Sequence, residues 1–136
     1  MLPDTDRVTD QPDSGFVPTD YVALFSGLFE YTSDAVCLIG LGDGVLLDVN
    51  RSFLEAFELA RAEAIGHRAS ALGIWLQPDD RPAVERELKD RGRIEGYRAR
   101  MRSRKSNDLE MTISAVLADW RGQPVVLGIG TVVSAA

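Results

Sequence analysis

The sequence is poor in several features, and each shortage excludes a class of protein. Its 136 residues include one cysteine, Cys37, so no disulfide can form within the chain. The single histidine, His67, offers no His–carboxylate or Ser–His arrangement for catalysis, and we do not expect an enzyme. No run approaches the roughly 20 apolar residues that cross a bilayer, and the first residues lack the pattern of a signal peptide. We therefore expect a cytoplasmic protein with no membrane segment.

Basic residues are also in the minority. The chain has 15 lysine and arginine residues against 21 aspartate and glutamate residues, which gives a net charge of −6. Phosphate binding would work against this overall field, so direct nucleic-acid binding is not expected. Apolar residues are plentiful, at 45% of the chain, and are enough for one domain with a single core.

The start of the chain divides into a tail and a helix. Residues 1–17 are acidic and polar and cannot bury enough apolar surface to offset their ordering entropy, so we expect a disordered tail. The apolar spacing of Val22, Phe25 and Phe29 then predicts a short amphipathic helix. Residues 18–133 are assigned to a single domain.

Apolar runs and turn residues divide the middle of the chain into a hairpin followed by helices. Residues 34–40 and 44–50 are two short apolar runs around a glycine-rich turn, a pattern typical of a β-hairpin. Helical spacing begins at Asn50, and a second short helical segment closes at Gly66. Residues 78–92 carry an acidic start, an early proline and a final glycine, which predicts a further helix.

The last third of the chain predicts three strands, over 97–104, 109–120 and 123–133. In the first of these, four arginines alternate strictly with smaller or apolar residues and should face solvent, paired with acidic and polar neighbours. The resulting order is β-β-α-α-α-β-β-β after the leading helix. Such an order predicts an α+β fold with a five-stranded antiparallel sheet and helices packed on one face.

The order and spacing of these motifs resemble the PAS domain family over about residues 21–133. The resemblance rests on "GDGVLLDVNRSF", "AEAIGH", "QPDDRPAVERELKDRG" and "RGQPVVLGIG" taken together and in this order. It implies a sheet cupped around a small cavity, in a sensory module of bacterial two-component signalling or transcription regulation. Asn50 would then cap the central helix, while Phe53 and Phe57 face the cavity or core.

The resemblance also bears on cofactors, and none is predicted. Relatives that bind haem usually ligate it through a histidine on the last long helix, and residues 81–90 contain none. In the flavin-binding LOV branch, a photoreactive cysteine lies where this chain has Ala69. Met101, Met111 and Gly130 take the places of polar residues that hold the flavin ring there. Haem ligated in the usual way and covalent flavin photochemistry are therefore both disfavoured.

A small-molecule site is expected on the helix side of the sheet. Gly128 and Gly130 have no side chains and leave room in the last strand, although aromatic residues could fill the same space. The arginines point outward, so the pocket suits an uncharged or aromatic molecule of low polarity. The predicted ligand-binding residues are Cys37, Ile39, Phe53, Phe57, Trp75, Tyr97, Met101, Met111, Ile113, Gly128 and Gly130.

The opposite face of the last strand is expected to meet a partner, because an apolar strip on an open sheet must be covered. The leading helix could cover it within one chain or across a homodimer. The predicted partner surface comprises Val22, Phe25, Phe29, Val125, Leu127 and Ile129.

Two functions remain open from the sequence. The first is a sensor that binds a small apolar or aromatic molecule and relays its state to an output domain. The second is a dimerisation or protein-interaction module with a filled core. Family members commonly end in Asp-Ile-Thr, whereas this chain has Val132, Val133 and Ser134. We expect residues 134–136 to be a truncated exit towards an output domain in a longer chain, with a stand-alone PAS protein as the alternative.

Overall fold

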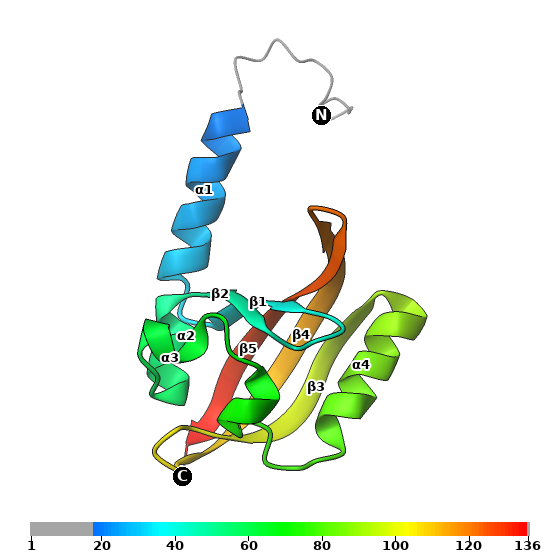
Figure 1. The fold of residues 1–136 in the computed structure, drawn as a ribbon. Coiled ribbons are helices and arrows are strands. Elements are labelled where there is room, and N and C mark those ends of the chain that lie inside the picture. Colours follow the sequence, from blue (N-terminus) through cyan, green and yellow to red (C-terminus); the bar gives the residue numbers. More distant parts are fainter. Residues whose placement is uncertain (1–17, 136) are drawn as a thin grey trace.

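A computed structural model describes residues 18–135 of the chain (Figure 1). The expected acidic tail, residues 1–17, lies outside the described residues, as does the side chain of Val22. No helix among the described residues is long and apolar enough to cross a membrane.

Five antiparallel strands form one sheet in the order β2-β1-β5-β4-β3, which confirms the predicted fold class. The hairpin β1-β2 and the three strands that follow the helices are joined where β1 pairs with β5. The strands are β1 Ala35–Gly40, β2 Leu46–Val49, β3 Arg93–Arg102, β4 Asp108–Trp120 and β5 Gln123–Ala135.

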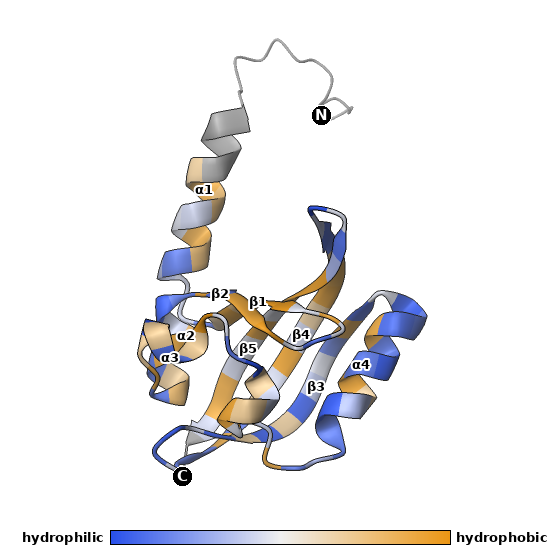
Figure 2. Cartoon of the chain, in the orientation of Figure 1, coloured by the Kyte–Doolittle hydropathy of each residue, from blue (hydrophilic) through white to orange (hydrophobic). Residues whose placement is uncertain are grey.

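The central helices cover one face of this sheet, while the first helix projects away from it (Figure 1). The covering elements are α2 Arg51–Phe57, α3 Arg61–Ala64, the 3-10 helix η2 Ala69–Leu72 and α4 Asp80–Arg91. The projecting helix is α1 Pro18–Tyr31. Hydrophobic residues line the inner strands, and α4 is largely hydrophilic outside (Figure 2). The core therefore lies between the sheet and the central helices.

The strand β3 differs from its predicted bounds at both ends. It begins at Arg93, ahead of the expected start at Tyr97, and ends at Arg102. The pairing register with β4 shifts between Ile94 and Tyr97, where Gly96 has a φ of +67°. A bulge of this kind interrupts the alternation of side chains, so the first residues of the strand did not fit the two-residue pattern.

Both edge strands are partly covered by the segment that follows α3. Trp75 bridges to Met101, and the flanking amides of Leu76 and Arg102 donate to Arg100 and Ile74 at 3.1 and 2.9 Å. On the other edge, Val45 of the hairpin bridges to Arg68. This aperiodic segment thus occupies backbone groups that would otherwise invite pairing with another chain.

Asn50 joins the hairpin to the first central helix. Its side-chain Oδ1 accepts hydrogen bonds from the amides of Val36 and Phe53, each at 2.9 Å, and its Nδ2 donates to the Asp34 carbonyl at 3.0 Å. Its own amide donates to the Val36 carbonyl at 3.0 Å. The side chain is fully buried. Asn50 caps α2, as the sequence indicates, and in addition it holds the start of β1.

We expect Asn50→Ala to lower the free energy of unfolding by about 3 kcal/mol or more. The variant loses a helix cap, worth about 1 kcal/mol, and leaves the buried amide of Val36 without a partner, at about 1–3 kcal/mol; the half-buried Asp34 carbonyl loses its partner too. Urea unfolding measures the change. The matched control is Asn107→Ala at an exposed asparagine that donates to Glu58, which should cost about 1 kcal/mol or less. Equal losses in the two variants would contradict the structural role of Asn50.

Candidate functional site

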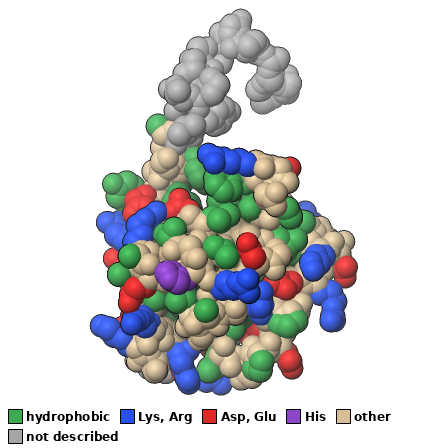
Figure 3. Space-filling model, in the orientation of Figure 1, with side chains coloured by type: hydrophobic (Ala, Val, Ile, Leu, Met, Phe, Trp, Pro, Cys, Tyr) green, Lys and Arg blue, Asp and Glu red, His purple; other side chains and the backbone are tan. Residues whose placement is uncertain are grey.

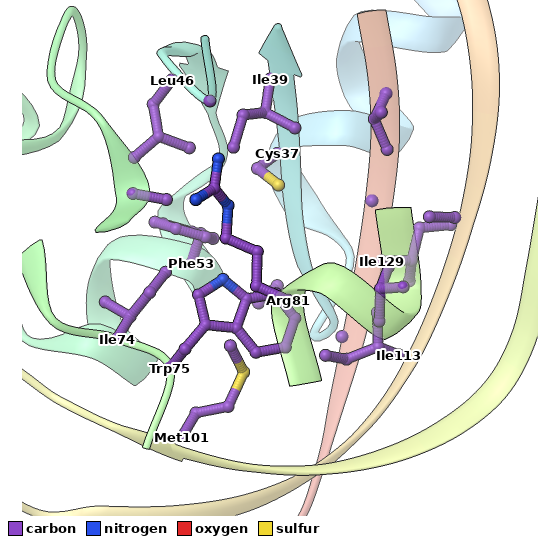
Figure 4. A pocket seen from close by; sticks show the side chains of 18 of the residues that line it. Cys37, Ile39, Leu46, Phe53, Ile74, Trp75, Arg81, Met101, Ile113 and Ile129 are labelled. Atoms are coloured by element: carbon purple, nitrogen blue, oxygen red, sulfur yellow. The ribbon is translucent and has the colours of Figure 1, made fainter. Parts of the chain in front are cut away.

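A cavity of about 120 Å³ lies between the sheet and the central helices (Figure 4). The strands β1, β4 and β5 form one wall, and α2, the segment around Ile74 and Trp75, and α4 form the other. Most of the lining is hydrophobic, so the body of the cavity suits an apolar group.

The structure brings nearly all of the predicted ligand-binding residues together around this cavity. The residues that line it are Cys37, Ile39, Phe53, Phe57, Trp75, Met101, Met111, Ile113, Gly128 and Gly130. Tyr97 is not among the lining residues. Its hydroxyl donates to Asp80 at 2.6 Å, which raises the pKa of Tyr97 and ties β3 to the first turn of α4.

The two inward glycines of β5 leave less room than their lack of side chains indicates. A Cβ atom built on Gly130 would lie 2.6 Å from the terminal methyl of Met111, so this thioether already fills the gap. A Cβ atom on Gly128 would lie 3.3 Å from the Cys37 Sγ. The remaining cavity therefore lies beside these two side chains, and Met111 is the flexible part of its wall.

Cys37 is a neutral thiol in the cavity wall. Removal of the sulfur from bulk water raises its pKa to about 12, and a hydrogen bond with the backbone of Gly128 offsets this only in part. Cys37 is half-buried, and it lies in the wall of the cavity. The thiol thus contributes a weak polar group to the site and is poorly suited to act as a nucleophile.

The cavity also includes residues that the sequence did not single out. Arg81, Val84 and Leu88 lie at spacings of three and four residues on α4, so they share the helix face that covers the sheet. The apolar members of this stripe were visible as the buried side of a predicted helix. Arg81 lies three residues before Val84, so the helical spacing of this stripe could have placed it at the cavity. The remaining lining residues include Leu46, Ala69, Ile74 and Glu85.

Arg81 is the one cationic residue in the cavity wall among the described residues. Its side chain crosses from α4 towards Leu46 in Figure 4. The Nε atom lies 3.2 Å from a Glu85 carboxylate oxygen, one helical turn later. A Cβ atom on Gly44 would lie 3.2 Å from the Arg81 Nη2, so the guanidinium reaches the turn between β1 and β2.

The described residues contain no group of three or more His, Cys, Asp or Glu side chains that could hold a metal ion. Ala69, at the position of the LOV cysteine, is buried and lines the cavity. An alanine there supplies no sulfur for a flavin adduct.

On the face of the sheet away from the central helices, here called the outer face, the arginines of β3 are paired as expected. Arg98 contacts Glu110 at 2.5 Å, and Arg102 contacts Asp108 at 3.0 Å. Exposed pairs of this kind contribute about 0–1 kcal/mol each. This part of the outer face is a solvated surface whose charges are largely balanced.

The apolar part of the outer face lies next to α1. A groove between α1 and the sheet is lined by Phe25, Phe29, Leu38 and Leu127, among others. Hydrophobic side chains gather beside α1 in Figure 3. Ile129 remains 39% exposed, so α1 covers this strip only in part.

Val125 does not belong to that exposed strip. It is only 2% exposed, between its Cα partners Gly40 of β1 and Ala118 of β4. A side chain with so little accessible surface has almost nothing to offer to a partner. The predicted partner surface is therefore corrected to exclude Val125, while Phe25, Phe29 and Leu127 lie together in the groove beside α1. Ile129 is 39% exposed and lies with the residues around the cavity, not with those of the groove.

No protein-family model matches the sequence, and no curated protein matches it. Solved structures do match in shape. The PAS domain of an HTR-like protein from Haloarcula marismortui is 17% identical with a TM-score of 0.69, over 85% of this chain and 93% of that chain. The PAS domain of a LuxR-family transcriptional regulator from Burkholderia thailandensis, solved with ethanol, is 14% identical with a TM-score of 0.66, over 80% and 96%. An RNA-binding Light-Oxygen-Voltage receptor is 19% identical with a TM-score of 0.71, over 93% and 37%. The chain therefore has the PAS fold.

We expect alkylation of Cys37 to be at least about a hundredfold slower in the folded protein than in urea at pH 8.5. At that pH a thiol with a pKa of 9.0 is about one-quarter ionised, whereas a pKa of about 12 leaves only about 0.03% as thiolate. Iodoacetamide labelling followed by mass spectrometry measures both rates. A Cys37→Ala, Ser70→Cys variant, with its thiol at an exposed position, should label rapidly in both states. Fast labelling of native Cys37 would mean that the cavity opens freely to solvent.

Proposed function

We propose that this domain is a sensory module of a signalling or regulatory protein, and that it binds a small apolar or aromatic molecule in its cavity. The observation that supports this function best is the apolar cavity between the sheet and the central helices. The PAS domains among its structural neighbours, which include that of a transcriptional regulator, support a regulatory context. The signal would pass through the sheet to an output domain.

The size of the cavity sets the size of the guest. Apolar cavities of about 150 Å³ stay dry and take up benzene or xenon. The cavity of about 120 Å³ is therefore suited to a guest with a body of roughly one small ring or a short branched chain. Met111 could make room for a somewhat larger guest by changing rotamer, because a thioether chain turns about three bonds.

Filling the cavity by mutation should abolish uptake of an apolar guest. We expect toluene to raise the melting temperature of the wild-type protein, because a ligand that binds only the folded state stabilises it. Gly128→Leu should remove that shift, since its side chain starts 3.3 Å from Cys37 and extends into the cavity. Thermal unfolding at increasing toluene concentration measures both effects.

The matched control for this substitution is Thr112→Leu, which adds an apolar side chain to the outward side of β4, opposite Arg98. This variant should respond to toluene as the wild type does. An unchanged toluene response in folded Gly128→Leu would show that the guest binds elsewhere. No response in the wild type would contradict the uptake of an uncharged apolar guest by the cavity.

The second candidate function, dimerisation or protein interaction, is favoured by α1. Its exposed apolar side chains include Leu24, Phe25, Leu28 and Tyr31, and Leu28 is 72% exposed. These side chains leave one side of α1 apolar and in contact with water, as expected for a surface that a partner covers. We propose that a second copy of this chain covers it, and that the domain is a homodimer.

Disruption of this surface should shift the assembly towards monomer. We expect Leu28→Glu to weaken dimerisation by about tenfold or more, because it would place an unpaired carboxylate in an apolar contact. Sedimentation velocity over a range of concentrations measures the dissociation constant. Ala62→Glu adds the same charge at an exposed position of α3 and should leave the dimer unchanged. A wild-type protein that stays monomeric at the highest concentrations would rule out the homodimer.

A further inference from the structure

The placement of Arg81 is unusual for an arginine on a hydrophilic helix. The helix α4 has several charged residues that face solvent, yet Arg81 extends along the face that meets the cavity. Its side chain is 35% exposed, so it lies neither in bulk water nor in the core. The long apolar stem lies against the cavity, and the charged end reaches the hairpin turn. This position puts a cation at the boundary between the apolar cavity and solvent.

The contacts of the guanidinium leave part of its hydrogen-bonding capacity unused. A guanidinium carries five N–H donors in a planar fork and no acceptor. Glu85 lies beside the Nε edge at 3.2 Å, and no other carboxylate of the described residues is paired with Arg81. The terminal nitrogens point towards Gly44 and Leu46, which offer no side-chain acceptor. Two N–H groups at the end of the fork are the arrangement that matches the two oxygens of a carboxylate.

A second donor lies in the same part of the wall. Figure 4 shows the indole nitrogen of Trp75 turned towards the side of the cavity that Arg81 crosses. An indole N–H can only donate, and within residues 18–135 it has no hydrogen-bond acceptor among the described contacts. The rest of the lining near it is apolar, including Ile74 and Met101. The N–H donors of the cavity wall thus lie on this side, where Glu85 beside Arg81 is the acidic residue of the lining.

We propose that the cavity binds a small monocarboxylate, with its ring or branched chain inside the cavity and its carboxylate between Arg81 and Trp75. This inference rests on the proposed function and specifies the class of ligand. A single negative charge fits because the wall holds one guanidinium, already shared with Glu85. A ligand with a second charge would place it against Glu85 or against apolar side chains. The preference for an anion differs from the uncharged guest that the sequence predicts.

Benzoate and toluene test the proposal, because they share a ring and differ in the carboxylate. At pH 7.5, we expect the wild-type protein to bind benzoate at least about tenfold more tightly than toluene. Arg81→Gln should weaken benzoate binding by about tenfold, the loss expected for one charge-assisted hydrogen bond, and should leave toluene binding unchanged. Binding is measured by titration with detection by two-dimensional NMR, so that the responding residues are identified.

The control variant is Arg86→Gln, which makes the same change in charge at an exposed position of the same helix. It should leave benzoate binding unchanged, and thermal unfolding verifies that both variants are folded. If toluene binds in the cavity and benzoate binds no better, the carboxylate proposal fails while the sensor proposal stands. Equal loss of benzoate binding in both variants would show that only the net charge of the protein matters and that Arg81 does not bind the carboxylate, which would overturn the proposal. If neither probe binds, both proposals fail.

Discussion

The buried side chain of Asn50 holds together the parts of the chain that enclose the cavity. One asparagine satisfies the amide of Val36, the carbonyl of Asp34 and the amide of Phe53 in the first turn of α2. These groups belong to the start of β1, the residue before it and the start of the helix; the two amides are buried and the Asp34 carbonyl is half-buried. Because an unsatisfied buried backbone group costs about 1–3 kcal/mol, Asn50 stabilises this turn from strand to helix. The turn then directs Phe53 and Phe57 onto the sheet.

The same reasoning explains which parts of the fold could be predicted from the sequence. Period-two alternation, capping residues and glycines after helices are local signals, and they gave the order of the elements and the antiparallel sheet. Gly66 has the left-handed φ of +83° that its position after a helix indicated. The start of β3 was missed because a bulge near Gly96 breaks the alternation. The segment from Arg68 to Trp75 has no period of its own, since it is shaped by the sheet edges that it covers.

The candidate site was predictable to the extent that its residues lie on regular elements. Strand residues such as Cys37 and Met101 point inward by alternation, and the structure places them around the cavity. Met111 on β4 fills the space next to Gly130 on β5. This could not be predicted, because it depends on the rotamer of Met111 and on how the two strands lie side by side. Tyr97 has the expected inward direction, yet its hydroxyl is taken up by Asp80. Arg81 was not singled out from the sequence, because only the arginines of β3 were considered, although its helical position places it on the inner face.

The two candidate functions meet on one strand and need not exclude each other. Gly128 and Gly130 of β5 face the cavity, while Leu127 of the same strand lines the groove beside α1. A guest large enough to displace Met111 would push its terminal methyl against β5 at Gly130. This residue has no side chain, so the contact is with the backbone itself. Because the interior is closely packed, such a displacement is transmitted to the other side of the strand. Suppose that α1 can lie against the sheet in two arrangements. A guest would then shift the balance towards the arrangement that binds it more tightly, and a guest that both arrangements bind equally would shift nothing. Coupling between cavity and surface therefore requires no path longer than the thickness of one strand.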